Sequence, residues 1–128
     1  MSTGTPPADR WYSPTHQWAR RLDDGRVEIG ITHYAQDALG DVVFVDLPAT
    51  GSTLARGEPF MVIESVKTAS DVHAPVSGRV EEVNEALRDA PERLNSDPYA
   101  NWLVRASSSD DPAAIGLADA ATYTASLG

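Results

Sequence analysis

Hydrophobic and polar residues alternate over several short stretches of the chain, the pattern of strands that bury one face. In the stretch 26–32, Val27, Ile29 and Ile31 alternate with polar or small residues. This period of two predicts a half-buried strand. Further apolar stretches predict a buried strand over 41–48, another strand over 60–66, and two short strands over 71–83 that are broken at Pro75 and Gly78.

Turn and helix signals separate these stretches. The sequence DDG at 23–25 predicts a hairpin turn before the first strand. Residues 33–40 place alanine and leucine on one helical face and end in Gly40, so they predict a short helix with a glycine stop. The connector 49–59 is rich in glycine and other turn residues.

Towards the C-terminus the pattern changes to an alanine-rich segment. Asp111 suits an N-cap and Pro112 suits the first helical position, and Gly116 interrupts the segment. We therefore expect one or two short C-terminal helices. Many short strands with frequent turns favour a mostly β barrel or sandwich over a parallel sheet.

Composition narrows the class of protein. The 128 residues suit one domain, which we expect at 11–128 after a disordered polar lead at 1–10. The formal net charge of -9 and the scattered arginines argue against a nucleic acid partner. We expect no membrane segment and no signal peptide, and interpret the chain as a cytoplasmic monomer.

The chain contains no cysteine, so any sulfur or redox chemistry has to come from a cofactor. Three histidines, His16, His33 and His73, stand in unrelated contexts without the close spacing of metal ligands. We predict no metal site.

Lys67 is the only lysine beside nine arginines, and it stands between two apolar stretches in IESVKTASDV. Two strands that meet at a tight turn would carry its amine into water, where an acylating enzyme could reach it. A solvated amine is a poor Schiff-base catalyst, because that chemistry needs a lysine with a lowered pKa. Composition alone also allows an incidental surface lysine in an arginine-rich protein.

The surrounding residues favour a specific role. The segment GEPFMVIESVKTASDVHAPVSGRVEEVN closely resembles the lipoylation segment of the glycine cleavage system H protein family. The stretches HQWARR, VEIGITHYAQDALGDVVFVDLP, NSDPY and WLVR occur in the order of that family. The resemblance covers nearly the whole chain from Trp11 onward, and it implies the barrel-sandwich hybrid fold of lipoyl and biotinyl domains.

The resemblance implies a carrier without catalytic activity, which bears lipoic acid in amide linkage on Lys67. Its arm would take the aminomethyl group of glycine from the pyridoxal-phosphate glycine decarboxylase (P-protein) to the aminomethyltransferase (T-protein). Dihydrolipoamide dehydrogenase (L-protein) would then reoxidise the arm. A lipoate ligase or octanoyl transferase, with lipoyl synthase, would install it.

Other residues receive roles from the same resemblance. Glu64, Ser65 and Val66, with Gly78 eleven residues after the lysine, match the motif that modifying enzymes recognise. Gly78 is also expected to permit a tight turn, and Asp71 is either a recognition residue or a solvated carboxylate.

A surface cleft for the arm would include His16, Gln17 and Trp18. The family usually has glutamate where this chain has Gln17, so a neutral amide replaces a carboxylate that could hold an ammonium group. His33 replaces a residue that is often acidic, and DPYANW is shorter than the usual loop.

Three alternatives follow from the residues. An H-like carrier could serve another lipoate-dependent pathway through the same lysine motif. A lysine-dependent enzyme would need a carbonyl-binding pocket around Lys67 and a lysine with a lowered pKa. A plain interaction module would carry no prosthetic group.

Overall fold

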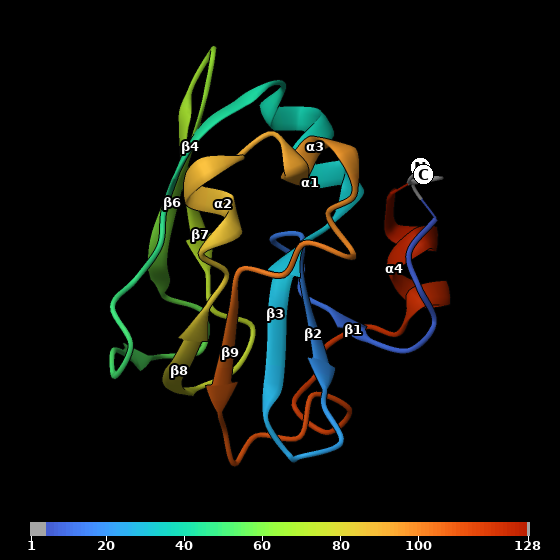
Figure 1. The fold of residues 1–128 in the computed structure, drawn as a ribbon. Coiled ribbons are helices and arrows are strands. Elements are labelled where there is room, and N and C mark those ends of the chain that lie inside the picture. Colours follow the sequence, from blue (N-terminus) through green and yellow to red (C-terminus); the bar gives the residue numbers. More distant parts are fainter. Residues whose placement is uncertain (1–4, 128) are drawn as a thin grey trace.

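Residues 5–127 are described by the computed structural model, and their strands form two antiparallel sheets (Figure 1). The six-stranded sheet has the order β1 (Trp11–Tyr12), β2 (Gln17–Arg21), β3 (Val27–Ile31), β9 (Val104–Ser107), β8 (Gly78–Val83) and β5 (Thr53–Leu54). The three-stranded sheet has the order β4 (Val42–Asp46), β6 (Pro59–Ser65) and β7 (Ala69–His73). The helices are α1 (His33–Leu39), α2 (Ala86–Asp89), α3 (Arg93–Ser96) and α4 (Ala120–Leu127).

The mostly β architecture confirms the fold expected from the strand pattern. Strand β3 occupies the alternating stretch, and the turn before it has Gly25 at φ +90°. Helix α1 ends at Gly40, whose φ of +78° is a conformation that glycine adopts without steric cost. The core between the sheets contains fully buried residues from both, such as Ile29 and Ile63, each worth about 1.5–3 kcal/mol on burial.

Strand β4 differs from the predicted buried strand. Val42 and Val45 are buried, but Val43 is 54% exposed and Phe44 is 49% exposed. The pairing of β4 with β6 shifts between Val42 and Phe44, as at a β-bulge, which places an extra residue opposite one partner residue. The alternation of faces therefore breaks, and two consecutive apolar side chains point outward.

The C-terminal segment forms one helix among the described residues. The predicted start at Pro112 is wrong: Asp111 accepts hydrogen bonds from the amides of Ala113 and Ala114, but these close only turns. Gly116, at φ +87°, ends them. Helix α4 begins only at Ala120, and the short helices α2 and α3 lie in a segment for which we predicted no element.

Part of the lead that was predicted to be disordered packs against the domain. The first four residues lie outside the described residues. The guanidinium of Arg10, however, lies over the Trp18 ring at 4.5 Å from its centroid, and its Nη1 donates to the carbonyl of Tyr99 at 2.9 Å. The Tyr12 hydroxyl donates to the Pro7 carbonyl. A cation over an indole face is attractive, which a polar composition does not reveal.

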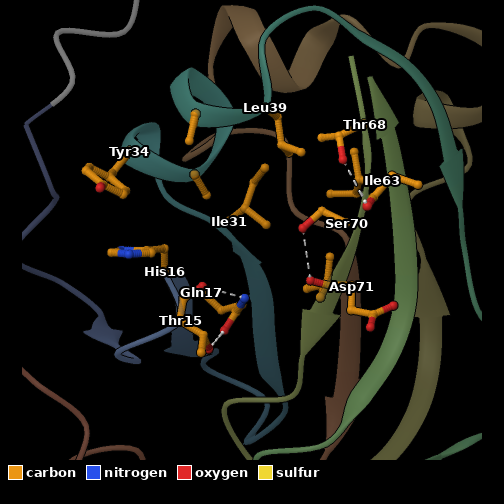
Figure 2. A pocket seen from close by; sticks show the side chains of 14 residues that line it. Thr15, His16, Gln17, Ile31, Tyr34, Leu39, Ile63, Thr68, Ser70 and Asp71 are labelled. Carbon is orange, nitrogen blue, oxygen red and sulfur yellow. Dashed lines mark hydrogen bonds between the residues drawn. The ribbon is translucent and has the colours of Figure 1, made fainter. Parts of the chain in front are cut away.

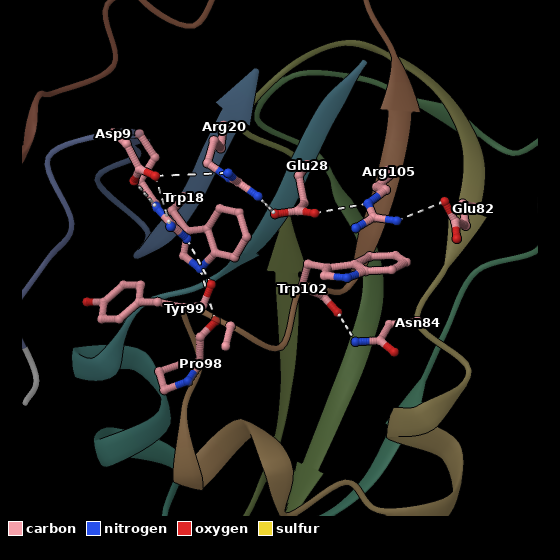
Figure 3. A network of polar contacts seen from close by, with 12 residues as sticks. Asp9, Trp18, Arg20, Glu28, Glu82, Asn84, Pro98, Tyr99, Trp102 and Arg105 are labelled. Carbon is pink, nitrogen blue, oxygen red and sulfur yellow. Dashed lines mark hydrogen bonds and ion pairs between the residues drawn. The ribbon is translucent and has the colours of Figure 1, made fainter. Parts of the chain in front are cut away.

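An ion-pair network crosses the outer side of the six-stranded sheet (Figure 3). The buried carboxylate of Glu28 pairs with Arg20 on β2 at 2.8 Å and with Arg105 on β9 at 2.9 Å. Arg105 continues to Glu82 on β8 and covers the ring of Trp102 at 4.0 Å. Because the buried Glu28 has partners on both neighbouring strands, its charge is compensated within the sheet.

Gly78 is required for close packing and not for a turn with positive φ. It begins strand β8 and pairs with Leu54 of β5. A Cβ atom at position 78 would lie 2.1 Å from the carbonyl oxygen of Ser107. The expectation of a tight turn at this residue is therefore corrected: the glycine lets two strands approach.

We predict that Gly78→Ala lowers the free energy of unfolding by about 1–3 kcal/mol, because the backbone of β9 has to move away from the new methyl group. Chemical denaturation would measure this loss. Glu81→Ala, an exposed change on the same strand, is the control and should stay within about 0.5 kcal/mol of the native protein. Equal stability of the two variants would contradict the packing role.

Candidate functional site

A cavity of about 290 Å³ opens between helix α1, the start of β2 and strand β7 (Figure 2). Its wall is formed by Thr15, His16, Gln17, Ile31, Tyr34, Ala35, Ala38, Leu39, Ile63, Thr68, Ala69, Ser70, Asp71 and Val72. Ile31, Leu39 and Ile63 give it a buried apolar floor, and the half-exposed Tyr34 stands at the rim. A largely apolar cavity with a few polar groups suits a flexible organic ligand.

Gln17 supports the turn that forms one side of this cavity. Its Oε1 accepts hydrogen bonds from the hydroxyls of Ser13 at 2.7 Å and Thr15 at 2.5 Å, and its Nε2 donates to the Thr15 carbonyl at 2.8 Å. The side chain is only 3% exposed. The amide therefore lines the cavity while most of its hydrogen bonds hold residues 13–17 in place.

His16 links the cavity to the C-terminal helix. Its backbone has φ +72°, the only positive φ at a non-glycine residue among those described. The ring lies 4.3 Å from that of Tyr34, between centroids, and its Nδ1 is 2.7 Å from the hydroxyl of Tyr123 on α4. That hydroxyl also lies 2.8 Å from Oγ1 of Thr32. The left-handed turn thus directs the imidazole between α1 and α4.

Burial shifts the acid–base behaviour of this cluster. Desolvation lowers the pKa of His16, because the charged imidazolium loses water around it. Desolvation also raises the pKa of Tyr123 to about 12, so its hydroxyl stays protonated near neutral pH. The contact between them is therefore a neutral hydrogen bond at pH 7.

The structure corrects the expectation for Trp18. Adjacent residues of a strand point to opposite faces, so Gln17 faces the cavity while Trp18 is fully buried on the other side of β2. The indole lies against Gly30, and its Nε1 donates to the Pro98 carbonyl at 3.2 Å. Trp18 contributes to packing and does not line this cavity.

Lys67 lies in the turn of the β6–β7 hairpin, which projects from the body of the protein (Figure 1). Its side chain is exposed. The nearly buried Ser65 holds the turn: its Oγ accepts from the amides of Lys67 at 3.3 Å and Thr68 at 3.2 Å and donates to the Thr68 carbonyl. The amide of Val66 donates to the Asp41 carbonyl at 3.0 Å. Ser65 thus stabilises the turn that carries the lysine.

Of the two carboxylate residues near the lysine, Glu64 lies outside the cavity, whereas Asp71 belongs to its wall. Glu64 pairs across the hairpin with Ala69, and Asp71 pairs with Val62. Both are exposed, and Figure 2 shows the Asp71 carboxylate directed away from Gln17. Ser70, which points inward from the same strand, was not predicted as a site residue because β7 was read only as a returning strand.

Asn95 fixes helix α1 beside the hairpin, and sequence reasoning missed it. Its Oδ1 accepts from the amide of Val42 at 2.9 Å. Its Nδ2 donates to the carbonyl of Gly40 at 2.8 Å and to Oε1 of Gln36 at 3.0 Å. Asn95 lies in α3, for which the sequence predicted no element, and an asparagine gives no signal that it contacts a helix more than fifty residues earlier.

The three histidines do not come together. His33 Nδ1 lies 3.1 Å from Gln36 Nε2 within α1, His73 ends strand β7, and His16 contacts Tyr123. Over residues 5–127 the histidines and carboxylates form no cluster of three that could hold a metal ion. In the same range, no helix is both long enough and apolar enough to cross a membrane.

Comparison with known proteins identifies relatives over nearly the whole chain. A family model described as Glycine cleavage H-protein matches residues 10–128. The glycine cleavage system H protein of Escherichia coli O7:K1 is 50% identical over 122 residues, which cover 94% of this chain and 95% of that protein. The protein of the same name from Salmonella newport is 49% identical with the same coverage.

A solved structure agrees with the fold as well. The crystal structure of a glycine cleavage system H protein from Mycobacterium marinum has a TM-score of 0.88 and 40% sequence identity to this chain. The match covers 96% of this chain and 99% of the other.

We predict that His16 makes stability depend on pH. Its pKa is lowered in the folded protein, so the unfolded chain binds more protons once the pH falls below about 6.5. The contribution of neutral His16 to the free energy of unfolding is therefore complete above that pH. It is lost as the pH falls through the pKa that His16 has in the folded protein. Denaturant titrations from neutral to mildly acidic pH should show a shallower slope for His16→Asn, which tolerates positive φ. Pro14→Ala, an exposed neighbour, should keep the native slope, and an unchanged slope in His16→Asn would refute the assignment.

We predict that Gln17→Glu loses about 1–3 kcal/mol of folding free energy at pH 7, because a buried carboxylate oxygen replaces the amide that donates to Thr15. Burial raises the pKa of the new carboxyl, so acidification should restore part of the loss by protonating it. Thermal unfolding at pH 7 and pH 5, with wild type alongside, measures both effects. If Gln17→Glu and wild type have the same midpoint at each pH, the Gln17 side chain does not stabilise the turn through its hydrogen bonds.

Proposed function

The chain belongs to the glycine cleavage H-protein family, and we propose that Lys67 is the residue that carries its lipoyl group. The protein is a lipoyl carrier of the glycine cleavage system without catalytic activity of its own, and its partners are the P-, T- and L-proteins of that system. The observation that supports the assignment of Lys67 is its place: the only lysine of the chain is exposed in the turn of a projecting hairpin.

The residues around Lys67 fit a covalently bound lipoyl group. The side chain is exposed, so an enzyme can reach the amine and acylate it. The next residue, Thr68, already belongs to the wall of the apolar cavity. A flexible apolar arm on Lys67 can therefore fold back along β7 into a space formed by this chain.

When bound, the lipoyl group supplies the sulfur chemistry that accepts and releases the aminomethyl unit, which a chain without cysteine cannot provide. The residues of the chain itself position the lysine and the cavity. Ser65 fixes the turn so that the lysine faces solvent, and Asn95 keeps α1 over the cavity. We propose that His16 and Gln17 border the arm when it lies in the cavity, with Tyr34 covering its entrance.

Gln17 gives this cavity a neutral wall. A carboxylate here could attract an ammonium group strongly, whereas a neutral amide gives a weaker hydrogen bond. The side chains of Ser70 and Gln17 offer polar atoms, and the carboxylate of Asp71 is directed elsewhere. We infer that this protein holds a positively charged load less firmly than a relative with glutamate at the same position.

We propose that Glu64, Ser65 and Val66 are read by the modifying enzymes, with Gly78 acting indirectly. Glu64 and Val66 are exposed beside the lysine, whereas Ser65 faces inward and shapes the turn. Gly78 lies in strand β8 of the other sheet, against Ser107. Its part in modification is thus to keep the sheets that support the hairpin correctly packed.

We propose further that a lipoate ligase or octanoyl transferase acts on this lysine together with lipoyl synthase. The protein would act as a monomer in the cytoplasm, as one domain from residue 11 to 128. A single exposed hairpin that visits several enzymes needs no second copy, and the curated relatives are bacterial. The exposed position of Lys67 also weighs against a lysine-dependent enzyme, whose amine has to be desolvated to act as a nucleophile.

We predict that Lys67→Arg folds like wild type but is not lipoylated, because the exposed guanidinium does not form the amide. Intact mass after expression with lipoate should show a lipoyl increment on wild type and none on the variant, and thermal unfolding should give equal midpoints. Arg79→Lys, an exposed lysine introduced on β8, is the matched control and should add no second increment. A lipoyl increment on Lys67→Arg would contradict the assignment.

A further inference from the structure

The outer side of the three-stranded sheet exposes apolar residues next to Lys67. Val43 and Phe44 point outward because of the bulge in β4, and Val66 is 70% exposed beside the lysine. The register places Phe44 opposite Glu64 and Val62 opposite Asp46. Residues two apart on a strand share a face, so Val62 and Glu64 lie on one side of β6, and the exposed Val66 follows in the turn.

This surface, which we call the outer face, therefore combines four apolar and three acidic residues. The apolar residues are Val43, Phe44, Val62 and Val66, and the acidic residues are Asp46, Glu64 and Asp71. Diagonal and opposite neighbours on adjacent strands are close enough to form one continuous patch. Contiguous exposed apolar groups of this kind mark interaction surfaces in monomeric proteins.

The charges of the outer face are not matched within the described residues. None of its three carboxylates forms an ion pair there, whereas Glu28 and Glu82 on the six-stranded sheet pair with arginines. Lysine and arginine are absent from 57–78 except for Lys67, and the one histidine there, His73, shares the face of Asp71 on β7. Over the described residues, the carboxylates of the outer face are thus unpaired beside its apolar residues. The outer face is therefore complementary to a basic surface on a partner protein.

We propose that the outer face is the docking surface for the enzyme that acylates Lys67, and that this enzyme presents an apolar depression bordered by arginine or lysine. The proposal rests on the function assigned to Lys67 above. In the reaction the lysine amine attacks an activated acyl donor, the amide bond forms as the bond to the leaving group breaks, and the amine loses a proton. Phe44 would enter the depression while the carboxylates meet the basic border.

The short length of the lysine side chain is the reason for assigning the outer face to the acylating enzyme. The amine extends from the backbone by only the four methylenes of lysine. An enzyme that acts directly on it has to touch residues beside Lys67, and Val43, Phe44 and Val66 are the large apolar side chains exposed on this face. An enzyme that acts on the far end of a bound arm can dock at a greater distance.

The test is the kinetics of lipoylation of unmodified protein by a lipoate ligase with lipoate and ATP, followed by intact mass. Phe44→Thr retains a residue that suits strands and removes the apolar side chain. We expect about a tenfold or greater rise in KM for the protein substrate, since central aromatic residues dominate binding at interfaces, with kcat nearly unchanged. Thermal unfolding of each variant shows whether its fold is retained.

A second variant tests the charges without touching the core. Asp46→Asn combined with Asp71→Asn should raise KM and weaken its dependence on salt, because fewer charges attract the partner. Leu127→Thr, at a comparably exposed apolar residue on α4, is the control and should behave as wild type.

The outcomes separate this proposal from its premise. Absence of lipoylation at Lys67 in wild type would overturn the function assigned to that residue. Normal lipoylation at Lys67 with unchanged KM in both outer-face variants would overturn only the docking surface. The docking proposal also fails if sedimentation shows self-association that Phe44→Thr abolishes, or if Phe44→Thr weakens binding to the P-protein alone, because the outer face would then serve a second copy or the decarboxylase.

Discussion

The side-chain amide of Asn95 holds together the three segments on which the site depends. Through its contacts with Gln36, Gly40 and Val42 it joins the end of α1 to the beginning of β4. Strand β4 pairs with β6, and the loop before it receives the amide of Val66. One residue therefore sets both the helix that covers the cavity and the base of the hairpin that carries Lys67. Its loss would leave three largely buried backbone or amide groups to find new partners.

The two sheets differ in how their charged side chains are arranged: ion pairs stabilise the six-stranded sheet, and the three-stranded sheet presents solvated carboxylates to a partner. Arg20 and Arg105 neutralise Glu28 across three strands of the larger sheet, where their hydrogen bonds fix the strand positions. In the smaller sheet the carboxylates stay solvated. A solvated carboxylate adds little to stability but contributes to the field that a partner meets on approach. The pairing of arginines in one sheet therefore leaves an acidic surface around the only lysine.

The sequence predicted those features that local periodicity encodes. Strand β3, helix α1 with its glycine stop, and the hairpin carrying Lys67 follow from alternation and turn residues alone. The exposure of Phe44 did not, because one bulge reverses a face without changing the apolar pattern. The helix expected at Pro112 is a turn, since a cap and a proline permit a helix without requiring one. The contact of His16 with Tyr123 joins residues far apart in the chain, and no local sequence pattern predicts it.

A carrier arm has to leave its protein as readily as it returns, and this constrains how the cavity can be built. A site that bound the arm very tightly would keep the minor, extended state too rare for transfer to another enzyme. The cavity here has an apolar floor, a half-exposed tyrosine at its rim and a neutral amide on its wall. Apolar contact of this extent shields a bound group from water, while the absence of an inward-pointing carboxylate among the described wall residues keeps the attraction for a positive load modest. With the arm in this cavity as proposed, the neutral amide of Gln17 would shift the balance towards release.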